Sequence, residues 1–152
     1  MVVKLLKILI DADGCPVVGL AINEAKAQNI PIHIFFDTTH IFCDDYAIMH
    51  VCDKGNDNVD YEVLKNTLQN DIVITQDYGL ACLALSKGAV CLNQNGLVYT
   101  NDSIDTLLQT RYIGQKIRKA GGRTKGPSKR TKENDNDFLF SLRLEIKKII
   151  EY

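Results

Sequence analysis

The sequence lacks the features of a membrane-spanning protein and those of a protein stabilised by disulfide bonds. No uninterrupted apolar stretch approaches the roughly 20 residues that a bilayer crossing needs. The N-terminal apolar run is short, meets Asp11 and has no small-residue cleavage site of the kind that ends a secretory signal. The five cysteines form an odd, widely spaced set without a C-x-x-C pair, which favours reduced thiols. We therefore expect a cytoplasmic protein that folds without disulfides.

Composition excludes disordered and collagen-like chains as well. The 152 residues are 45% hydrophobic and 24% charged, which suits one ordinary domain with a buried core. The net charge of -1 conceals an uneven distribution. Residues 1–110 contain 6 Lys/Arg and 14 Asp/Glu, whereas residues 111–152 contain 12 and 5. An acidic body thus carries a basic C-terminal third, which bears on partners and not on fold.

The order of apolar segments predicts strands that alternate with helices. Apolar runs over residues 5–10, 31–36, 47–52 and 71–75 are typical of strands, and two shorter β-rich runs, 89–92 and 97–99, flank an Asn-Gly turn. Helical spacing predicts helices over about 16–28, 61–68, 80–85, 104–119 and 138–150. This alternation indicates a single α/β domain over residues 1–152 with a mainly parallel central sheet. Residues 120–134 are expected to form a basic loop, and residues 135–152 a helix that packs back on the body.

Carboxylates follow two of the predicted strands, at the edge where α/β sheets bind ligands. Asp11 and Asp13 come directly after the first strand, and Asp77 follows the strand over 71–75. Asp57 and Asp60 lie at the start of the helix that precedes that strand. Carboxylates gathered in one pocket repel each other, and Mg²⁺ or Mn²⁺ is the partner that best holds them ionised together. Such an ion can activate water and neutralise charge on a phosphodiester.

Local structural roles for three of these carboxylates stay open. Asp60 or Asp77 can cap a helix N-terminus, and Asp57 can shape a turn. That alternative is weakest for Asp11 and Asp13, because two carboxylates directly after a buried strand are costly unless a cation or a donor group meets them.

A basic run lies between residues 116 and 132, with eight Lys/Arg and no carboxylate. Such a run either attracts the phosphate backbone of a nucleic acid or is solvated surface. The candidates for phosphate contact are Arg118, Arg123, Lys125 and Lys129. The run is not a nucleotide-binding P-loop, because Pro127 occupies the position of the required lysine.

Three other chemistries fit the sequence less well. The Asp-x-Asp pair suggests a haloacid-dehalogenase-type phosphatase, but Cys15 stands where that pattern has Thr or Val. A zinc site from His40, Cys43, His50 and Cys52 matches no common finger spacing. Asp11 and Asp13 would oppose a reactive Cys15 thiolate.

Four segments, in the same order along nearly the whole chain, carry a family resemblance. They are IDADGCPV from Ile10, the D-x-x-D spacing of Asp57 and Asp60, DIVITQD from Asp71 and RKAGGRTKGP from Arg118. Together they resemble the YaiI/YqxD family of bacterial proteins, which is grouped with PIN-like domains, some of them metal-dependent ribonucleases. The resemblance implies a PIN-like three-layer sandwich and a nuclease site at Asp11, Asp13, Asp57, Asp60 and Asp77. Gly14 and Tyr78-Gly79 depart from the usual family residues, and neither change removes a carboxylate.

These observations lead to two functional expectations. The first is a nuclease that hydrolyses phosphodiesters, in RNA more than DNA, with Mg²⁺ or Mn²⁺ as cofactor. Asp11, Asp13 and Asp77 would be its catalytic metal ligands, and Asp57 and Asp60 would either bind the metal directly or contact its ligands. The second is a non-catalytic module that binds nucleic acid or another phosphorylated partner and uses the acidic pocket for a structural or regulatory ion. A metal ion with open coordination positions facing the basic segment would favour the nuclease, whereas an ion fully surrounded by protein ligands would favour the binding module.

Overall fold

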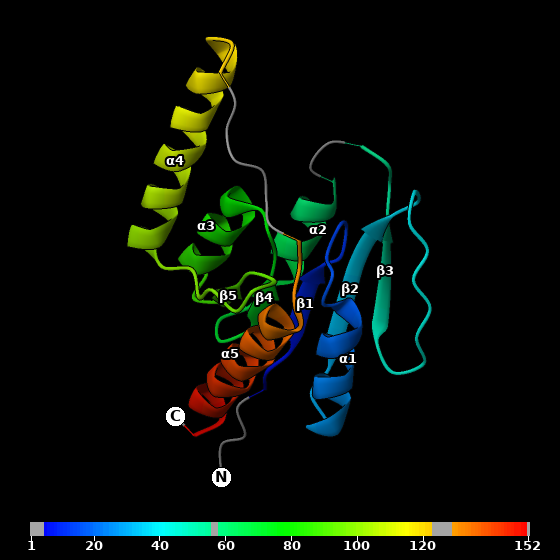
Figure 1. Cartoon of the computed structure of the whole chain (residues 1–152). Coiled ribbons are helices and arrows are strands. Elements are labelled where there is room, and N and C mark those ends of the chain that lie inside the picture. The colour runs from blue at the N-terminus through cyan, green and yellow to red at the C-terminus, as the bar shows by residue number, and fades with distance from the viewer. Residues whose placement is uncertain (1–4, 56–57, 123–128, 152) are drawn as a thin grey trace.

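A five-stranded sheet forms the centre of the fold (Figure 1). The computed structural model describes residues 5–55, 58–122 and 129–151. Neighbouring strands pair in the order β3-β2-β1-β4-β5, and each of these pairs is parallel. The predicted mainly parallel sheet is thus confirmed. The strands are β1 (Ile8–Asp11), β2 (Ile32–Asp37), β3 (Ile48–Cys52), β4 (Ile72–Ile74) and β5 (Val90–Leu92).

Helices cover both faces of the sheet and bury a separate apolar cluster on each. On one face, α1 (Val18–Ala27) and α5 (Lys132–Glu151) pack over side chains such as Ile8 and Ile10 of β1. On the other, α2 (Asn58–Asn66), α3 (Tyr78–Ser86) and α4 (Asn101–Lys119) cover Leu9 and its neighbours. Successive strand residues point to opposite faces, so central strands buried on both sides read as nearly continuous apolar runs. The result is the expected three-layer α/β sandwich.

The direction in which the chain adds strands reverses beside β1. From β1 the chain proceeds to β2 and β3 on one side, and then to β4 and β5 on the other. In open parallel sheets, ligands bind beyond the carboxyl ends of the strands at such a reversal. Asp11 is the last residue of β1, and Asp77 lies three residues beyond the end of β4. The topology therefore places both carboxylates at the favoured edge.

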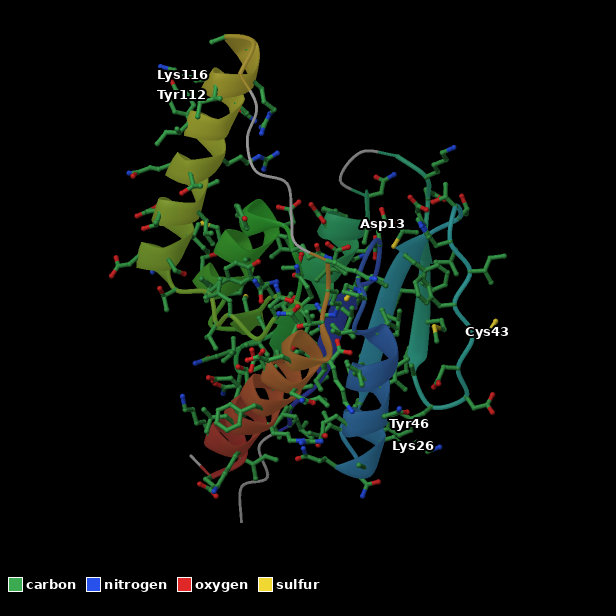
Figure 2. The ribbon with its side chains drawn as sticks, in the orientation of Figure 1. Asp13, Lys26, Cys43, Tyr46, Tyr112 and Lys116 are labelled. Carbon is green, nitrogen blue, oxygen red and sulfur yellow. The ribbon has the colours of Figure 1, made fainter. Side chains whose placement is uncertain are left out.

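The helix α4 is anchored to the body at its start and extends away from it. Thr100 and Ser103 form a capping box that fixes its first turn, and Ile104 is buried against α3 and the sheet. Most residues beyond Thr110 are exposed. The far end of α4, where Tyr112 and Lys116 are labelled, stands clear of the body (Figure 2). No helix in the described part of the chain combines the length and apolarity needed to span a bilayer.

Several predicted boundaries differ from the structure. The run over 97–99 makes only an isolated antiparallel bridge, between Leu92 and Val98. The helix α5 begins at Lys132, inside the expected basic loop. Its start is fixed by reciprocal hydrogen bonds, from the Thr131 N–H to Oδ1 of Asn134 (2.9 Å) and from the Asn134 N–H to Oγ1 of Thr131 (3.3 Å). These side-chain caps lie ahead of the first apolar residue of the helix, so apolar periodicity alone set the boundary too late.

Candidate functional site

Two adjoining hollows open at the carboxyl ends of β1 and β4, and both are lined by Asp11, Asp13 and Asp77. The larger, of about 700 Å³, is also lined by Arg111 and Arg118 of α4. The smaller, of about 450 Å³, is lined in addition by Asp37, Lys54, Gly55, Val59 and Asp60. We call the pair the acidic cleft. Four of the five predicted carboxylates thus meet in one place, and the fifth, Asp57, lies outside the described residues.

Asp11 is the most strongly perturbed carboxylate of the acidic cleft. Burial raises its pKa from 3.8 to about 6, the hydrogen bond from Thr75 opposes this rise, and the negative charges of Asp77 and Asp13 add to it. A carboxyl group with this pKa changes protonation close to neutral pH. Perturbed titratable groups in a hollow are candidates for function.

Thr75 links Asp11 to Asp77. Its hydroxyl donates to Oδ2 of Asp11 at 3.0 Å, and Oγ1 accepts the backbone N–H of Asp77, also at 3.0 Å. The Thr75 carbonyl accepts the hydroxyl of Tyr99 at 3.1 Å, which secures this turn from beneath. Thr75 and Tyr99 are both buried. The carboxylates of β1 and β4 therefore stand on a rigid support that the sequence analysis did not identify.

Asp77 also performs the local role that the sequence left open. It is the N-cap of α3, and its Oδ1 accepts the N–H groups of Gly79 (2.8 Å) and Leu80 (3.1 Å). The cap holds the side chain in one orientation and leaves Oδ2 for another partner. Capping and ligand binding are thus compatible in geometry, although the cap uses half of the carboxylate.

Asp13 faces an imidazole. Its Oδ1 lies 3.2 Å from Nδ1 of His40, and both side chains are about half exposed. His40 Nδ1 also lies 3.0 Å from the hydroxyl of Thr39 and 3.9 Å from Asp37. Hydrogen bonds from the Thr39 hydroxyl and the Thr39 N–H lower the pKa of Asp37. The end of β2 thus supplies Asp37 to the acidic cleft, and the loop after β2 places His40 against Asp13.

Sequence reasoning missed both Asp37 and Arg111. Asp37 directly follows the predicted strand over 31–36, as Asp11 follows the run over 5–10, so the rule that selected Asp11 applied equally to Asp37. Arg111 lies seven residues before Arg118, on the side of α4 that lines the acidic cleft. Seven residues are two turns of helix, about 10 Å. Apolar spacing in α4 did not reveal which side would face the carboxylates.

The predicted phosphate-binding residues are only partly described. Arg118 lines the acidic cleft, and Lys129 is an exposed residue ahead of α5. Arg123 and Lys125 lie outside the described residues. Arg130, another member of the basic run, is used for structure: its guanidinium donates to Asp135, to Oδ1 of Asn95 and to the Gln94 carbonyl at 2.7–2.8 Å. These bonds fasten the start of α5 to the turn after β5.

The oxygen-rich acidic cleft matches the donors that Mg²⁺ and Mn²⁺ prefer. Within residues 5–55, 58–122 and 129–151, however, no three Asp, Glu, His or Cys side chains are arranged to hold a metal ion. Asp13 is turned to His40, and Oδ1 of Asp77 is turned to the α3 backbone. Asp11 would meet a cation with Oδ1, since Oδ2 is bonded to Thr75. Each of the three carboxylates thus has one oxygen engaged by the protein, at Thr75, His40 or the α3 backbone, and ligation would depend on the other oxygen of each.

The structure does not support a reactive cysteine or the zinc site that the sequence analysis considered. Burial raises the pKa of Cys15, Cys52 and Cys91, which disfavours the reactive thiolate. His40 faces Asp13, whereas His50 faces His33 across β2 and β3, with 2.7 Å between the His33 Nδ1 and His50 Nε2 atoms. The two histidines of the zinc site considered from the sequence are thus drawn into different contacts.

Comparison with known proteins covers nearly the whole chain. The family model described as "Uncharacterized BCR, YaiI/YqxD family" matches residues 9–148. A "UPF0178 protein" of Ruminiclostridium cellulolyticum is 48% identical over 142 residues, 93% of this chain and 93% of that protein. Proteins of the same name from Exiguobacterium sibiricum and Clostridium perfringens are 48% and 42% identical, over 88% and 95% of this chain and 91% and 97% of their own. No solved structure matches the chain significantly. The chain, including the segments that form the acidic cleft, belongs to the YaiI/YqxD family.

Proposed function

We propose that this protein is a nuclease that depends on Mg²⁺ or Mn²⁺ and hydrolyses phosphodiesters in RNA. One observation carries the proposal: Asp11, Asp13 and Asp77 line the same cleft as Arg111 and Arg118 of α4. Carboxylates from the strand ends and guanidinium groups from α4, lining one hollow, suit a phosphodiester that needs both a cation and charge neutralisation. The PIN-like resemblance of the chain supports the same chemistry.

The residues divide into two roles. Asp11, Asp13 and Asp77 would hold the ion, with Asp37 and Asp60 lining the adjoining hollow. When bound, a divalent ion supplies an activated water molecule and a positive charge beside the phosphate. Arg111 and Arg118 would hold phosphate groups of the strand, since a planar guanidinium donates two parallel hydrogen bonds to phosphate oxygens. The spacing of these arginines along α4, about 10 Å, suits phosphates that are not adjacent.

A second candidate is a module that binds a phosphorylated partner without cleaving it. A specific observation favours it: Asp13 and Asp77 already have partners in His40 and the α3 N-terminus, and a pKa raised to about 6 leaves Asp11 neutral in about half of the molecules at pH 6. An acidic cleft with its charge offset in this way can admit an anion through Arg111 and Arg118 alone.

One experiment separates the two candidates. Purified protein is incubated with a fluorescent single-stranded RNA and Mn²⁺ or Mg²⁺, and cleavage and binding are both measured for wild type, Asp11→Asn and Arg111→Gln. A nuclease loses cleavage in Asp11→Asn while it keeps much of its RNA affinity, and Mn²⁺ raises the melting temperature of wild type but not that of Asp11→Asn. Binding that is lost in Arg111→Gln, with no cleavage by wild type in either metal, would instead establish the binding module.

A further inference from the structure

The helix α5 carries a second apolar strip, on the side that faces away from the sheet. Phe138 and Leu142 are buried beneath the helix, whereas Phe140 and Leu144 are 70% and 41% exposed. Residues four apart lie on one face of a helix. The strip borders a shallow groove of about 420 Å³ lined by Asn136, Leu139, Phe140, Arg143, Leu144 and Lys147, all from α5. In Figure 1 the outer side of α5 lies at the front, uncovered by the described elements.

Charge changes sign along this outer face. Glu133 and Asp137 are exposed in its N-terminal half, and Arg143 and Lys147 are exposed in its C-terminal half. Arg143 binds Glu24 of α1 with one nitrogen, at 2.7 Å from Nε, which holds its side chain against the body. A helix laid antiparallel on this face, with the same sequence, would place its basic half over the acidic half. A parallel copy would place like charges together.

We propose that two copies of this chain pair through the outer faces of their α5 helices, antiparallel and related by a two-fold axis level with residue 142. In this register Phe140 of one copy packs against Leu144 of the second copy, and Asp137 faces Lys147 of the second copy. Each contact occurs twice, as in any isologous interface. The opposed helix dipoles favour the same orientation. Glu133 meets Glu151 of the second copy only at the rim, where water and salt screen their repulsion.

The size of the strip indicates a reversible pair. A helix of 20 residues is about 30 Å long. Stable complexes bury a total surface area of at least about 1,200 Å². A single pair of helices of this length is expected to bury that area or less. The state of the protein should therefore shift from monomer to dimer as its concentration rises. This pairing is independent of the proposed nuclease, because α5 covers the face of the sheet opposite to α4.

Sedimentation velocity of the full chain over about a hundredfold range of concentration tests the pairing. Wild type is expected to form a dimer, and Phe140→Ser should raise its dissociation constant at least about tenfold, because the buried ring is removed from both copies. Leu68→Ser is the matched control: Leu68 is 64% exposed, lies between α2 and β4, and should leave dimerisation unchanged. Circular dichroism verifies that each variant is folded.

Charge reversal tests the orientation and register. Asp137→Lys and Lys147→Asp should each weaken the dimer, since each sets like charges face to face. The double variant restores an opposite pair and should regain most of the affinity. A protein that stays monomeric throughout, a dimer that survives Phe140→Ser, or a double variant no better than the singles would each overturn the proposal.

Discussion

Thr75 and Asp11 lie at the ends of neighbouring strands, and the Thr75 hydroxyl donates a hydrogen bond of 3.0 Å to Oδ2 of Asp11. Because Thr75 Oγ1 also accepts the N–H of Asp77, one buried side chain sets the positions of two proposed ligands. A carboxylate that accepts such a bond is easier to ionise. Thr75 thus limits the cost of placing charge at this end of β1.

Thr75→Val is expected to raise the pKa of Asp11 further and to destabilise the protein. Valine has nearly the shape of threonine but neither donates to Asp11 nor accepts from Asp77, so the free energy of unfolding should fall by about 1–3 kcal/mol. The measurements are a carboxyl NMR titration and urea unfolding. Thr67→Val is the matched control: Thr67 is a buried threonine whose hydroxyl donates to the Val63 carbonyl at 2.7 Å. It should lose stability and leave the Asp11 pKa unchanged.

Asp11→Asn is expected to stabilise the metal-free protein above pH 6. The pKa of Asp11 is raised from 3.8 to about 6 by folding, so its contribution to stability is present below about pH 4 and is lost as pH rises through about 6. Asparagine stays neutral and can still accept from Thr75, so the gain should be on the order of 2 kcal/mol. Thermal unfolding with chelator at pH 4 and pH 8 measures it. Equal gains at both pH values would contradict the raised pKa.

Two variants of Asp77 distinguish its role as a helix cap from its proposed role as a metal ligand. Asparagine caps helices about as well as aspartate, so Asp77→Asn should keep the stability of the protein within a few tenths of a kcal/mol, whereas Asp77→Ala should lose about 1 kcal/mol. Both variants should lose the rise in melting temperature that Mn²⁺ causes.

If Asp13 and Asp77 hold the same ion, Asp13→Asn and Asp77→Asn should each lose hydrolysis almost as fully as the double variant. An Asp77→Asn protein with the wild-type Mn²⁺ response would limit Asp77 to its cap.

The sequence predicted the sheet, and the positions of Asp11 and Asp77 at its carboxyl edge, because both follow from the burial of the strands. A nearly continuous apolar run such as Ile72–Ile74 predicts a central strand, and an acidic residue where that run stops lies at the ligand-binding edge. Contacts between distant segments were not predictable in this way. Nothing local to Thr75 or His40 shows that they meet Asp11 and Asp13, because the sheet register and the loop after β2 create those contacts.

Arg111 and Arg118 are expected to provide affinity for RNA without providing chemistry. Removing one arginine that binds a phosphate of a single strand should flatten the slope of log affinity against log salt by about 0.7, so the double Arg→Gln variant should flatten it by about 1.4. The decrease in affinity should be similar for unrelated sequences, since phosphate contacts carry no base information. Lys26→Gln is the control, because Lys26 lies at the opposite end of the sheet from Asp13 (Figure 2). If the double variant shows the wild-type slope, Arg111 and Arg118 do not bind the phosphates of the strand.

Acidification is expected to destabilise the protein through His33 of β2 and His50 of β3, which face each other. The two rings face each other with 2.7 Å between nitrogens, so they can share one proton but not hold two. Burial lowers the pKa of both, and the positive charges of His50 and Lys7 lower that of His33 further, while Asp71 opposes them. A histidine whose pKa falls on folding contributes stability that is fully present above its unfolded pKa of about 6.5 and is lost as pH falls from there through the folded pKa.

The histidine pair should therefore contribute a drop in the free energy of unfolding of wild type as pH falls from about 7 to about 5, and protonation of Asp11 works against this drop in the same range. The drop should be smaller in the His33→Gln/His50→Gln double variant, because neither glutamine takes up a proton. His40→Gln is the matched control and should retain the drop, since His40 faces Asp13 and is absent from the histidine pair. Denaturant unfolding at several pH values measures the difference. Identical pH dependence in wild type and the double variant would show that the pair takes up its protons equally in the folded and unfolded chain.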